Sequence, residues 1–253
     1  MRKLVMGDIH GAYKALRQCL ERSDFDYEND QLIQLGDVVD GYPQSYECIE
    51  ELLKIKRLIP LKGNHDDWFA EFINIDFHPF YWTYGGKGTL ISYLEHSGKK
   101  GGYFATGSGF KTALVSADIP LSHKNFFNDQ QLYHIDTSKR CFVHAGFNRH
   151  VPFYDQEITE YYWNRDLWLD ARAHKEMVKG TEKFEIITPF KEIYIGHTPT
   201  TNFGEDKPIK TFNIINMDTG AGHSGRLTMM DIDTKEFWQS DPLPTLYSEN
   251  FRD

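Results

Sequence analysis

Three short apolar runs near the start of the chain each end at a glycine that is followed by polar residues. The runs cover residues 4–6, 32–35 and 58–61. The segments next to them are Gly7-Asp8-Ile9-His10-Gly11, Gly36-Asp37-Val38-Val39-Asp40 and Gly63-Asn64-His65-Asp66. A short apolar run bounded by turn residues is typical of a buried strand. The polar groups therefore follow the C-terminal ends of successive strands, which line one crevice in an open α/β sheet.

The segments between these runs have helical periodicity. Residues 12–22 place apolar side chains at helical spacing, at Ala12, Ala15, Leu16, Cys19 and Leu20. The pattern returns after Pro43, a residue suited to a first helical turn, at Tyr46, Ile49, Leu52 and Leu53. Residues 1–62 therefore predict the order strand–helix–strand–helix–strand. This alternation indicates an α/β protein with a mostly parallel sheet and right-handed crossovers.

Residues 68–138 depart from this alternation. They are rich in aromatic side chains, and helical spacing is visible at Leu90, Ile91, Tyr93 and Leu94. We expect a helical insertion that covers part of the active-site crevice. The glycine cluster at residues 85–88 lacks the spacing of a phosphate-binding Walker loop, so it is interpreted as a turn.

The second half of the chain is richer in strands. Apolar stretches at residues 140–143 and 192–195 lead into His144-Ala145-Gly146 and Gly196-His197, and further strands are expected at 212–217 and 227–232. A chain of 253 residues suits one large domain, which we place at residues 1–240. Residues 241–253 contain two prolines and scattered charge, so we expect a C-terminal surface tail.

The composition excludes some classes of function. A net charge of −9 and a pI near 5.6 argue against sequence-independent binding of nucleic acid, which needs a basic face. The apolar run at the start is too short for a signal peptide and no long apolar stretch follows, so we expect a cytoplasmic protein without a membrane span. Cys19, Cys48 and Cys141 form no Cys-x-x-Cys pair and are interpreted as small buried hydrophobic residues in a reducing compartment.

The candidate metal ligands follow the strands and lie beside glycines. They are Asp8, His10, Asp37, Asn64, His144 and His197. The two oxygens of Asp37 can bridge two cations, and mixed oxygen and nitrogen ligation without thiolate favours Mn²⁺, Fe or Zn²⁺ over Cu(I). Each residue alone could be a helix cap, a turn former or a hydrogen-bonded core group. The whole set indicates a site for two divalent metal ions, with Mn²⁺ as the first candidate and Fe, Zn²⁺ or Ni²⁺ as alternatives.

Taken together, these motifs resemble the calcineurin-like metallophosphoesterase superfamily. Its pattern runs Asp-x-His, Gly-Asp-x-x-Asp, Gly-Asn-His-Asp, His-x-Gly and Gly-His, and the match spans about residues 1–235 of this chain. The motif spacing and the stretch Asp218-Thr219-Gly220-Ala221 are similar to the bacterial and bacteriophage-type serine/threonine phosphatase branch. The resemblance implies a two-sheet β-sandwich flanked by helices, in an αββα arrangement.

The resemblance also implies roles for the motif residues. The metal ligands divide into two sets that share one carboxylate: Asp8, His10 and Asp37 for one ion, and Asp37, Asn64, His144 and His197 for the other. A hydroxide that bridges the two ions would be the nucleophile, because metal coordination lowers the pKa of water. His65, paired with Asp40, would be the general acid that protonates the leaving oxygen.

The candidates for binding the phosphoryl oxygens are Asn64 and two arginines. The protein-phosphatase branch has an arginine directly after the second motif, where this chain has Gly41. Arg165 is the candidate replacement, and Arg149 is a second candidate. His223, which lies between glycines at 222 and 225, is interpreted as a turn residue.

We therefore expect a phosphatase that hydrolyses phosphate monoesters, with a phosphorylated protein or peptide as substrate. The alternative is a hydrolase of dinucleoside polyphosphates or other nucleotides with the same metal chemistry. The aromatic insertion could stack a base as easily as it could cover a peptide. A non-catalytic binding module of the same fold is the remote alternative, and it would be expected to have lost a ligand or His65.

Overall fold

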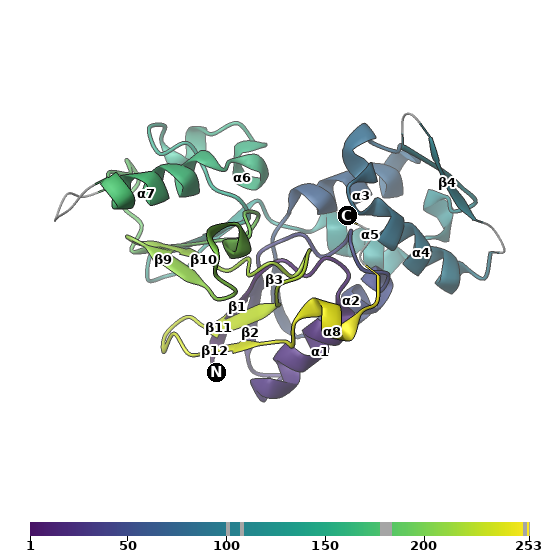
Figure 1. Ribbon diagram of the computed structural model, residues 1–253, viewed down its shortest axis with the longest axis horizontal. Helices are drawn as coiled ribbons and strands as arrows, with labels where there is room; N and C mark the ends of the chain where they lie inside the picture. The colour runs from purple at the N-terminus through teal and green to yellow at the C-terminus, as the bar shows by residue number, and fades with distance from the viewer. Residues whose placement is uncertain (100–101, 107–108, 178–183, 250–251, 253) are drawn as a thin grey trace.

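The computed structural model describes residues 1–99, 102–106, 109–177, 184–249 and 252 (Figure 1). Its first part alternates strands and helices in the order β1 (Lys3–Met6), α1 (Tyr13–Arg22), β2 (Gln31–Gln34), α2 (Ser45–Leu52) and β3 (Arg57–Pro60). The predicted alternation is confirmed, although Pro43 lies just outside α2 because the helix begins after Gln44. The three strands pair in parallel, with Leu4 beside Leu32 and Leu32 beside Leu58.

Two strands from the end of the chain complete the first sheet. β11 (Thr228–Asp231) pairs antiparallel with β1, and β12 (Phe237–Gln239) pairs antiparallel with β11. The strand order is β12-β11-β1-β2-β3. The sheet is therefore mixed, and its parallel part carries the first three sequence motifs on one edge.

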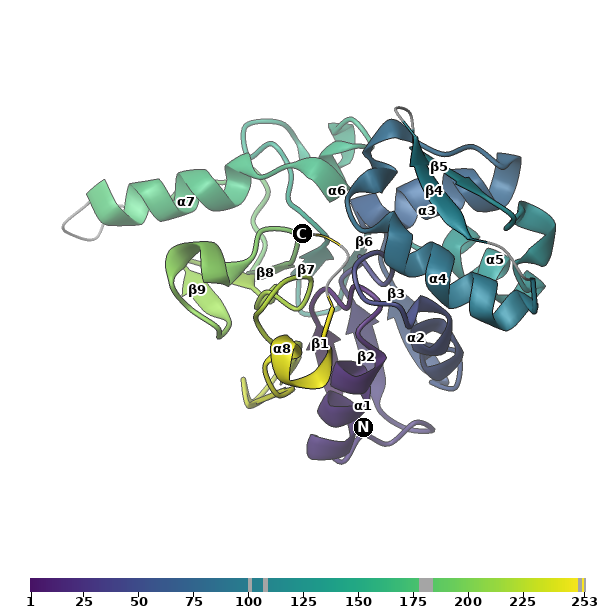
Figure 2. The same ribbon diagram turned by 45° about the vertical axis from the view of Figure 1, so that its right-hand side comes forward.

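Residues 64–135 form a mainly helical segment on one side of this sheet (Figure 2). Its elements are α3 (Asn64–Ile75), η1 (Phe80–Thr83), α4 (Gly86–Ser97), β4 (Tyr103–Thr106), β5 (Gly109–Thr112), η2 (Ser116–Asp118), α5 (Leu121–Asn128) and β6 (Tyr133–Ile135). The segment is thus not wholly helical, because β4 and β5 form a hairpin and β6 joins the second sheet. The glycine cluster is the start of α4 rather than a simple turn. Gly88 lets that helix pack directly on the backbone of Gly41, where a Cβ would collide.

The second sheet has the strand order β6-β7-β8-β10-β9. Its further strands are β7 (Arg140–Val143), β8 (Glu192–Ile195), β9 (Ile209–Thr211) and β10 (Ile214–Asn216). The expected strand at 212–217 is shorter than predicted, because Phe212 has a φ of 54° and forms the turn from β9 to β10. The connections contain η3 (Phe153–Asp155), α6 (Glu160–Trp163), α7 (Asp166–Met177) and η4 (Thr200–Phe203).

The hydrophobic core has the layered arrangement that the resemblance implied. Side chains from both sheets meet in a central cluster that includes Val5, Ile33, Phe142, Tyr194 and Ile215. A larger cluster packs the first sheet against α1, α2 and the helical segment, and another packs the second sheet against α7. The αββα prediction is therefore confirmed, and the three cysteines are buried as expected.

The segment after Asp241 does not begin as a surface tail. It forms α8 (Leu243–Leu246), and the Leu243 side chain is completely buried. The ring of Tyr247 packs on Tyr42 with ring centroids 4.5 Å apart, and its hydroxyl donates to Gln44 Oε1 at 2.7 Å. In both ribbon views α8 lies close to α1 (Figures 1 and 2).

Among the described helices, none combines the length and the apolar character that crossing a membrane would require.

Candidate metal centre

The loops at the C-terminal ends of five strands bring the predicted metal ligands together. Asp8 and His10 follow β1, Asp37 follows β2 and Asn64 opens α3 after β3. His144 and His197 follow β7 and β8 in the other sheet. All six residues are buried, with His197 the most exposed at 6%. The site therefore lies at the edge where the two sheets meet, and each sheet contributes ligands to it.

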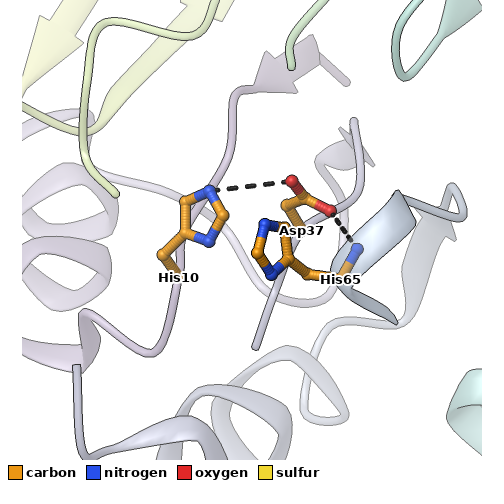
Figure 3. A group of neighbouring side chains, drawn as sticks. All are labelled: His10, Asp37 and His65. Carbon is orange, nitrogen blue, oxygen red and sulfur yellow. Dashed lines mark hydrogen bonds and ion pairs between the residues drawn. The ribbon is translucent and has the colours of Figure 1, made fainter. Parts of the chain in front are cut away.

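Asp37 occupies the centre of this arrangement. The potential ligand atoms of His10, Asp37 and His65 lie within 4.8 Å of one another, and so do those of Asp37, His144 and His197. Asp37 Oδ2 is 3.7 Å from His10 Nε2 and 3.4 Å from His144 Nε2. Figure 3 shows His10 and Asp37, from two loops, and His65, from the first turn of α3, lying close together. One carboxylate between two groups of imidazoles has the position that a bridging ligand needs.

Backbone carbonyls fix the orientation of two of the histidines. His10 Nδ1 lies 2.8 Å from the carbonyl oxygen of Asp40, and His144 Nδ1 lies 2.7 Å from that of Leu35. A carbonyl oxygen can only accept, so Nδ1 carries the proton in each ring. Nε2 is then directed into the site, and it is the nitrogen that can bind a metal ion once it carries no proton.

The loops hold several site residues in a left-handed backbone conformation. Positive φ angles occur at His10 (52°), Asp37 (55°), Asp40 (68°) and His197 (65°). Such angles are uncommon for residues other than glycine, and they cluster where function requires a fixed geometry. The motif glycine Gly196 allows close approach, because a Cβ there would collide with the Asp8 carboxylate.

The donor set fits a divalent metal ion. Asp8 Oδ1 and His197 Nε2 are buried and have no hydrogen-bond partner within the described residues. Burial raises the pKa of Asp8 well above its usual range and lowers the pKa of His197. Burial would also lower the pKa of His144, but the nearby Asp37 raises it to about 9. A cation bound among these groups would supply the partner that both unpaired atoms lack.

His65 and Asp40 form the predicted pair. His65 Nδ1 is 2.9 Å from Asp40 Oδ2, which leaves the His65 Nε2 directed toward the cavity. The other oxygen of Asp40 accepts hydrogen bonds from Trp82 Nε1 at 3.0 Å and Thr89 Oγ1 at 2.7 Å. Both donors come from residues 68–138, so the helical segment fixes the carboxylate that orients His65.

The two candidate arginines lie in different environments. Arg165 Nη1 donates to the carbonyl oxygen of His197 and to Thr198 Oγ1, each at 3.0 Å, and Arg165 lines the cavity over the ligands. The Arg149 guanidinium lies over the ring of Phe184 and 3.4 Å from Asp170 Oδ2. The structure therefore brings Arg165 into the site and does not bring Arg149 there.

Asp66 is a residue of the third motif whose role the sequence analysis missed. Its buried carboxylate accepts hydrogen bonds from the backbone N–H groups of Asp37 (2.8 Å), Val38 (2.9 Å) and Gly63 (3.1 Å). Gln130 Nε2 donates to the same carboxylate at 2.9 Å. Asp66 thus connects the loop after β2 to the start of α3 and fixes the positions of Asp37 and Asn64 relative to each other. Its place inside the motif was the signal that could have identified it.

The sequence analysis also missed Asp218, His223 and Arg252 as residues of the site. All three line a polar cavity of 280 Å³ together with the metal-ligand candidates. Asp218 directly follows β10, the same strand-end position as the predicted ligands, and burial raises its pKa to about 6. His223 lies in the expected loop but faces the site. No local pattern marks Arg252.

A second cavity of 490 Å³ opens beside the polar one. Trp68, Tyr84 and Trp163 line it, together with His65, Arg165 and Arg252. The rings of Trp68 and Trp163 have centroids 5.5 Å apart. A small polar pocket for an anion thus adjoins a larger aromatic pocket of the size that holds an organic group.

Oxygen and nitrogen ligands, a histidine–aspartate pair and an arginine surround one polar cavity. The fold and this site together define a metal-dependent hydrolase of phosphoric esters. The chain belongs to the calcineurin-like phosphoesterase family, whose sequence profile matches residues 1–208. The resemblance seen in the motifs is thereby confirmed.

Individual relatives cover most of the chain at low identity. A serine/threonine-protein phosphatase 2 of Escherichia coli K12 is 26% identical over 90% of this chain and 91% of its own length. A Bacillus anthracis bis(5'-nucleosyl)-tetraphosphatase is 24% identical over 89% of this chain and 88% of its own. A crystal structure assigned as a diadenosine tetraphosphatase superposes with a TM-score of 0.62 at 16% identity, covering 95% of this chain and 93% of that one. That likeness concerns the fold alone.

Proposed function

We propose that the protein is a phosphomonoesterase that uses two divalent metal ions, with Mn²⁺ as the first candidate, and acts on phosphorylated protein side chains. The observation that carries the proposal is the shared position of Asp37 between two groups of ligands, directly beside the His65–Asp40 pair. The protein phosphatases among the relatives support the substrate class.

Different residues of the site would bind the metal ions, donate the proton and orient the phosphoryl group. Asp8, His10 and Asp37 would hold one ion, and Asp37, Asn64, His144 and His197 would hold the other. When bound, such ions act as Lewis acids on a phosphoryl oxygen and make water nucleophilic at neutral pH. His65 Nε2 faces the cavity and is the group placed to give a proton to the leaving oxygen. Arg165 lines the same cavity, where its guanidinium can orient the phosphoryl group.

A hydrolase of dinucleoside polyphosphates is the second candidate. The observation in its favour is the aromatic cavity, where Trp163 is 40% exposed and lies near the Trp68 ring. Aromatic side chains in such a position stack well on nucleobases. The tetraphosphatases among the relatives support the same class.

A substrate panel separates the two candidates. The Mn²⁺-loaded protein is assayed with phosphoserine and phosphothreonine peptides, diadenosine tetraphosphate and an aryl phosphate, and kcat/KM is compared. The first proposal requires the phosphopeptides to exceed the dinucleotide. The reverse order would replace it by the second candidate. His65→Asn protein purified in parallel shows whether a contaminating phosphatase contributes.

Trp163→Ala gives an independent comparison on the same panel. If a base stacks on Trp163, the substitution removes a contact worth roughly 1–3 kcal/mol, so KM for the dinucleotide rises about 5- to 150-fold. The aryl phosphate serves as the internal reference, because it is too small to fill the aromatic cavity. An unchanged KM for the dinucleotide would remove the specific support for the second candidate.

A further inference from the structure

A cationic side chain from the far end of the chain lies inside the candidate metal centre. Arg252 Nη1 is 2.6 Å from His10 Nε2, and Arg252 Nη2 is 3.3 Å from His65 Nε2. A guanidinium is always charged and has only donors, so it donates to the unprotonated nitrogens of these rings. Arg252 therefore faces both a metal-ligand candidate and the candidate general acid.

Two glycines from separate loops make room for this side chain, and a third lies beside it. A Cβ on Gly85 would lie 2.7 Å from Arg252 Cγ, and a Cβ on Gly222 would collide with Arg252 Nη1. At Gly41 the Cβ position is 3.4 Å from Arg252 Cδ, which is ordinary contact. Side chains at the first two positions would push the arginine out. The arginine thus passes two positions that have no side chain.

The segment before Arg252 is anchored next to the site. Leu243 is fully buried, Tyr247 packs on Tyr42, and Lys14 Nζ donates to the carbonyl oxygen of Leu246 at 2.8 Å. The Tyr42 hydroxyl also donates to the carbonyl oxygen of His223, at 2.6 Å. The anchor therefore attaches to the same loops that line the polar cavity. It reduces the entropy that would be lost on fixing Arg252 there.

Arg252 and Arg165 line both cavities from different parts of the fold. Arg165 follows α6 and is held by the loop that carries His197, whereas Arg252 arrives between the loops that carry His10 and Gly85. A phosphoryl group placed over the ligands would lie in the cavity that both guanidinium groups line.

We infer that Arg252 is a substrate-binding residue that holds the phosphoryl oxygens together with Arg165. The inference rests on the proposed function for the identity of the substrate, but the binding of an anion can be measured without turnover. A divalent ion and the guanidinium cannot share His10 Nε2. Arg252 is therefore expected to give up that nitrogen to the ion and to donate to the phosphoryl oxygens instead.

The test is the affinity of the Mn²⁺-loaded protein for inorganic phosphate, measured by isothermal titration calorimetry. Arg252→Ala removes charge-assisted hydrogen bonds, so the Kd for phosphate should rise about 10- to 100-fold with the metal content unchanged. Arg252→Lys keeps the charge but loses the paired donors of the guanidinium, so its Kd for phosphate should lie between those of the wild type and Arg252→Ala. Arg57→Ala is the matched control, because Arg57 is exposed at the start of β3, the opposite end of the strand from the site.

The outcomes separate this inference from the proposed function. An unchanged or tighter phosphate Kd in Arg252→Ala would overturn the inference. If the activity of the Arg252→Ala protein also rose, Arg252 would be a group that competes with the metal ion for His10 and not a substrate-binding residue. A wild-type protein that binds phosphate through Arg252 but hydrolyses no ester on the panel would contradict the proposed function and leave the inference standing.

Discussion

His65 is held in one orientation by Asp40, and this sets its expected contribution to catalysis. A general acid matters most when the leaving group is poor, and it typically contributes about 10²–10⁴-fold. His65→Asn should therefore slow hydrolysis of a phosphoserine peptide by about that factor and hydrolysis of nitrophenyl phosphate much less. The measurement is kcat for both substrates at saturating Mn²⁺. His150→Asn, at an exposed turn, is the control.

Asp40→Asn should follow the same trend more weakly. The substitution weakens the hydrogen bond that orients the His65 ring, while an amide oxygen can still accept from Trp82 and Thr89. Equal losses on both substrates, with the metal content preserved, would rule out proton donation by His65. They would indicate instead that the pair positions the phosphoryl group.

Asp37 is the residue whose loss should damage metal binding most, because both groups of candidate ligands contain it. In Asp37→Asn one oxygen becomes an amide that cannot bind a cation as a carboxylate does. After loading with Mn²⁺, elemental analysis should give about two ions per chain in the wild type and about one or fewer in the variant. Asp24→Asn, an exposed carboxylate, controls for net charge. Two ions in the Asp37→Asn protein would refute the bridging role.

At the scale of elements, Asp66 joins the loop after β2 to the first turn of α3. In Asp66→Asn one of the two carboxylate oxygens becomes an NH2 group, which would face either the N–H of Val38 or those of Asp37 and Gly63 and cannot accept from them; these N–H groups have no other acceptor in this arrangement of the described chain. The free energy of unfolding should fall by about 3 kcal/mol, since the loss of a buried charged acceptor leaves donors unpaired. Chemical denaturation at pH 8 measures it.

The neighbouring residue provides the matched control for this prediction. Asp67 pairs with Lys62 at 3.1 Å on a partly exposed part of the same helical turn. A partly exposed ion pair contributes little, so Asp67→Asn should change the free energy of unfolding by less than about 1 kcal/mol. Similar losses in both variants would mean that the hydrogen bonds of Asp66 do not stabilise the fold beyond an ordinary surface pair.

The helices and strands that could be predicted from the sequence are those whose hydrophobic pattern agrees with their burial in the folded protein. β1 and β2 are largely buried apolar runs followed by a glycine, β3 is a half-buried one, and α1 and α2 show one apolar face. The packed start of the C-terminal segment was not predicted, because Pro242 and the charges around it are locally typical of a loop. The burial of Leu243 depends on the packing of α8 against α1, which exists only after folding.

The same distinction applies to the candidate site. The ligand candidates and the His65–Asp40 pair were recognisable because they sit in strand-end motifs. Arg252 has no motif, and its place depends on glycines at 85 and 222 that a single sequence cannot connect with it. Trp82 of η1 and Thr89 of α4, which donate to Asp40, likewise become its partners only through the packing of these two elements on the loop after β2.

At the scale of the whole molecule, the site requires the two sheets to keep a fixed relation, since each contributes ligands. Arg140 of β7 is one connection between them. Its guanidinium donates to Asp136 Oδ2 at 2.7 Å within the second sheet and to the carbonyl oxygen of Ile232, at 3.0 Å, after β11 of the first. Lys235 makes a second connection by donating to Glu192 and to the Ile232 carbonyl oxygen.

Asp136 gives this connection a defined dependence on pH. Burial alone would raise the pKa of Asp136, but hydrogen bonds from the Arg140 amide and guanidinium hold it below its usual range. The pKa in the folded protein is therefore lower than in the unfolded chain. The ionised carboxylate stabilises the fold above the unfolded-state value of about 3.9, and this contribution is lost as the pH falls through the folded-state pKa.

Asp136→Asn should therefore destabilise the protein in a pH-dependent way. The amide oxygen can still accept from Arg140 but carries no charge, so the free energy of unfolding should fall by about 1–2 kcal/mol at pH 7. At pH 3 the difference between variant and wild type should shrink, because this pH lies below the unfolded-state pKa of about 3.9 and the unfolded wild-type chain then binds a proton at Asp136. Urea titrations at both pH values measure it, with the exposed Asp155→Asn as control. A difference that stays constant from pH 7 to pH 3 would show that the Asp136 charge does not help to hold the two sheets together.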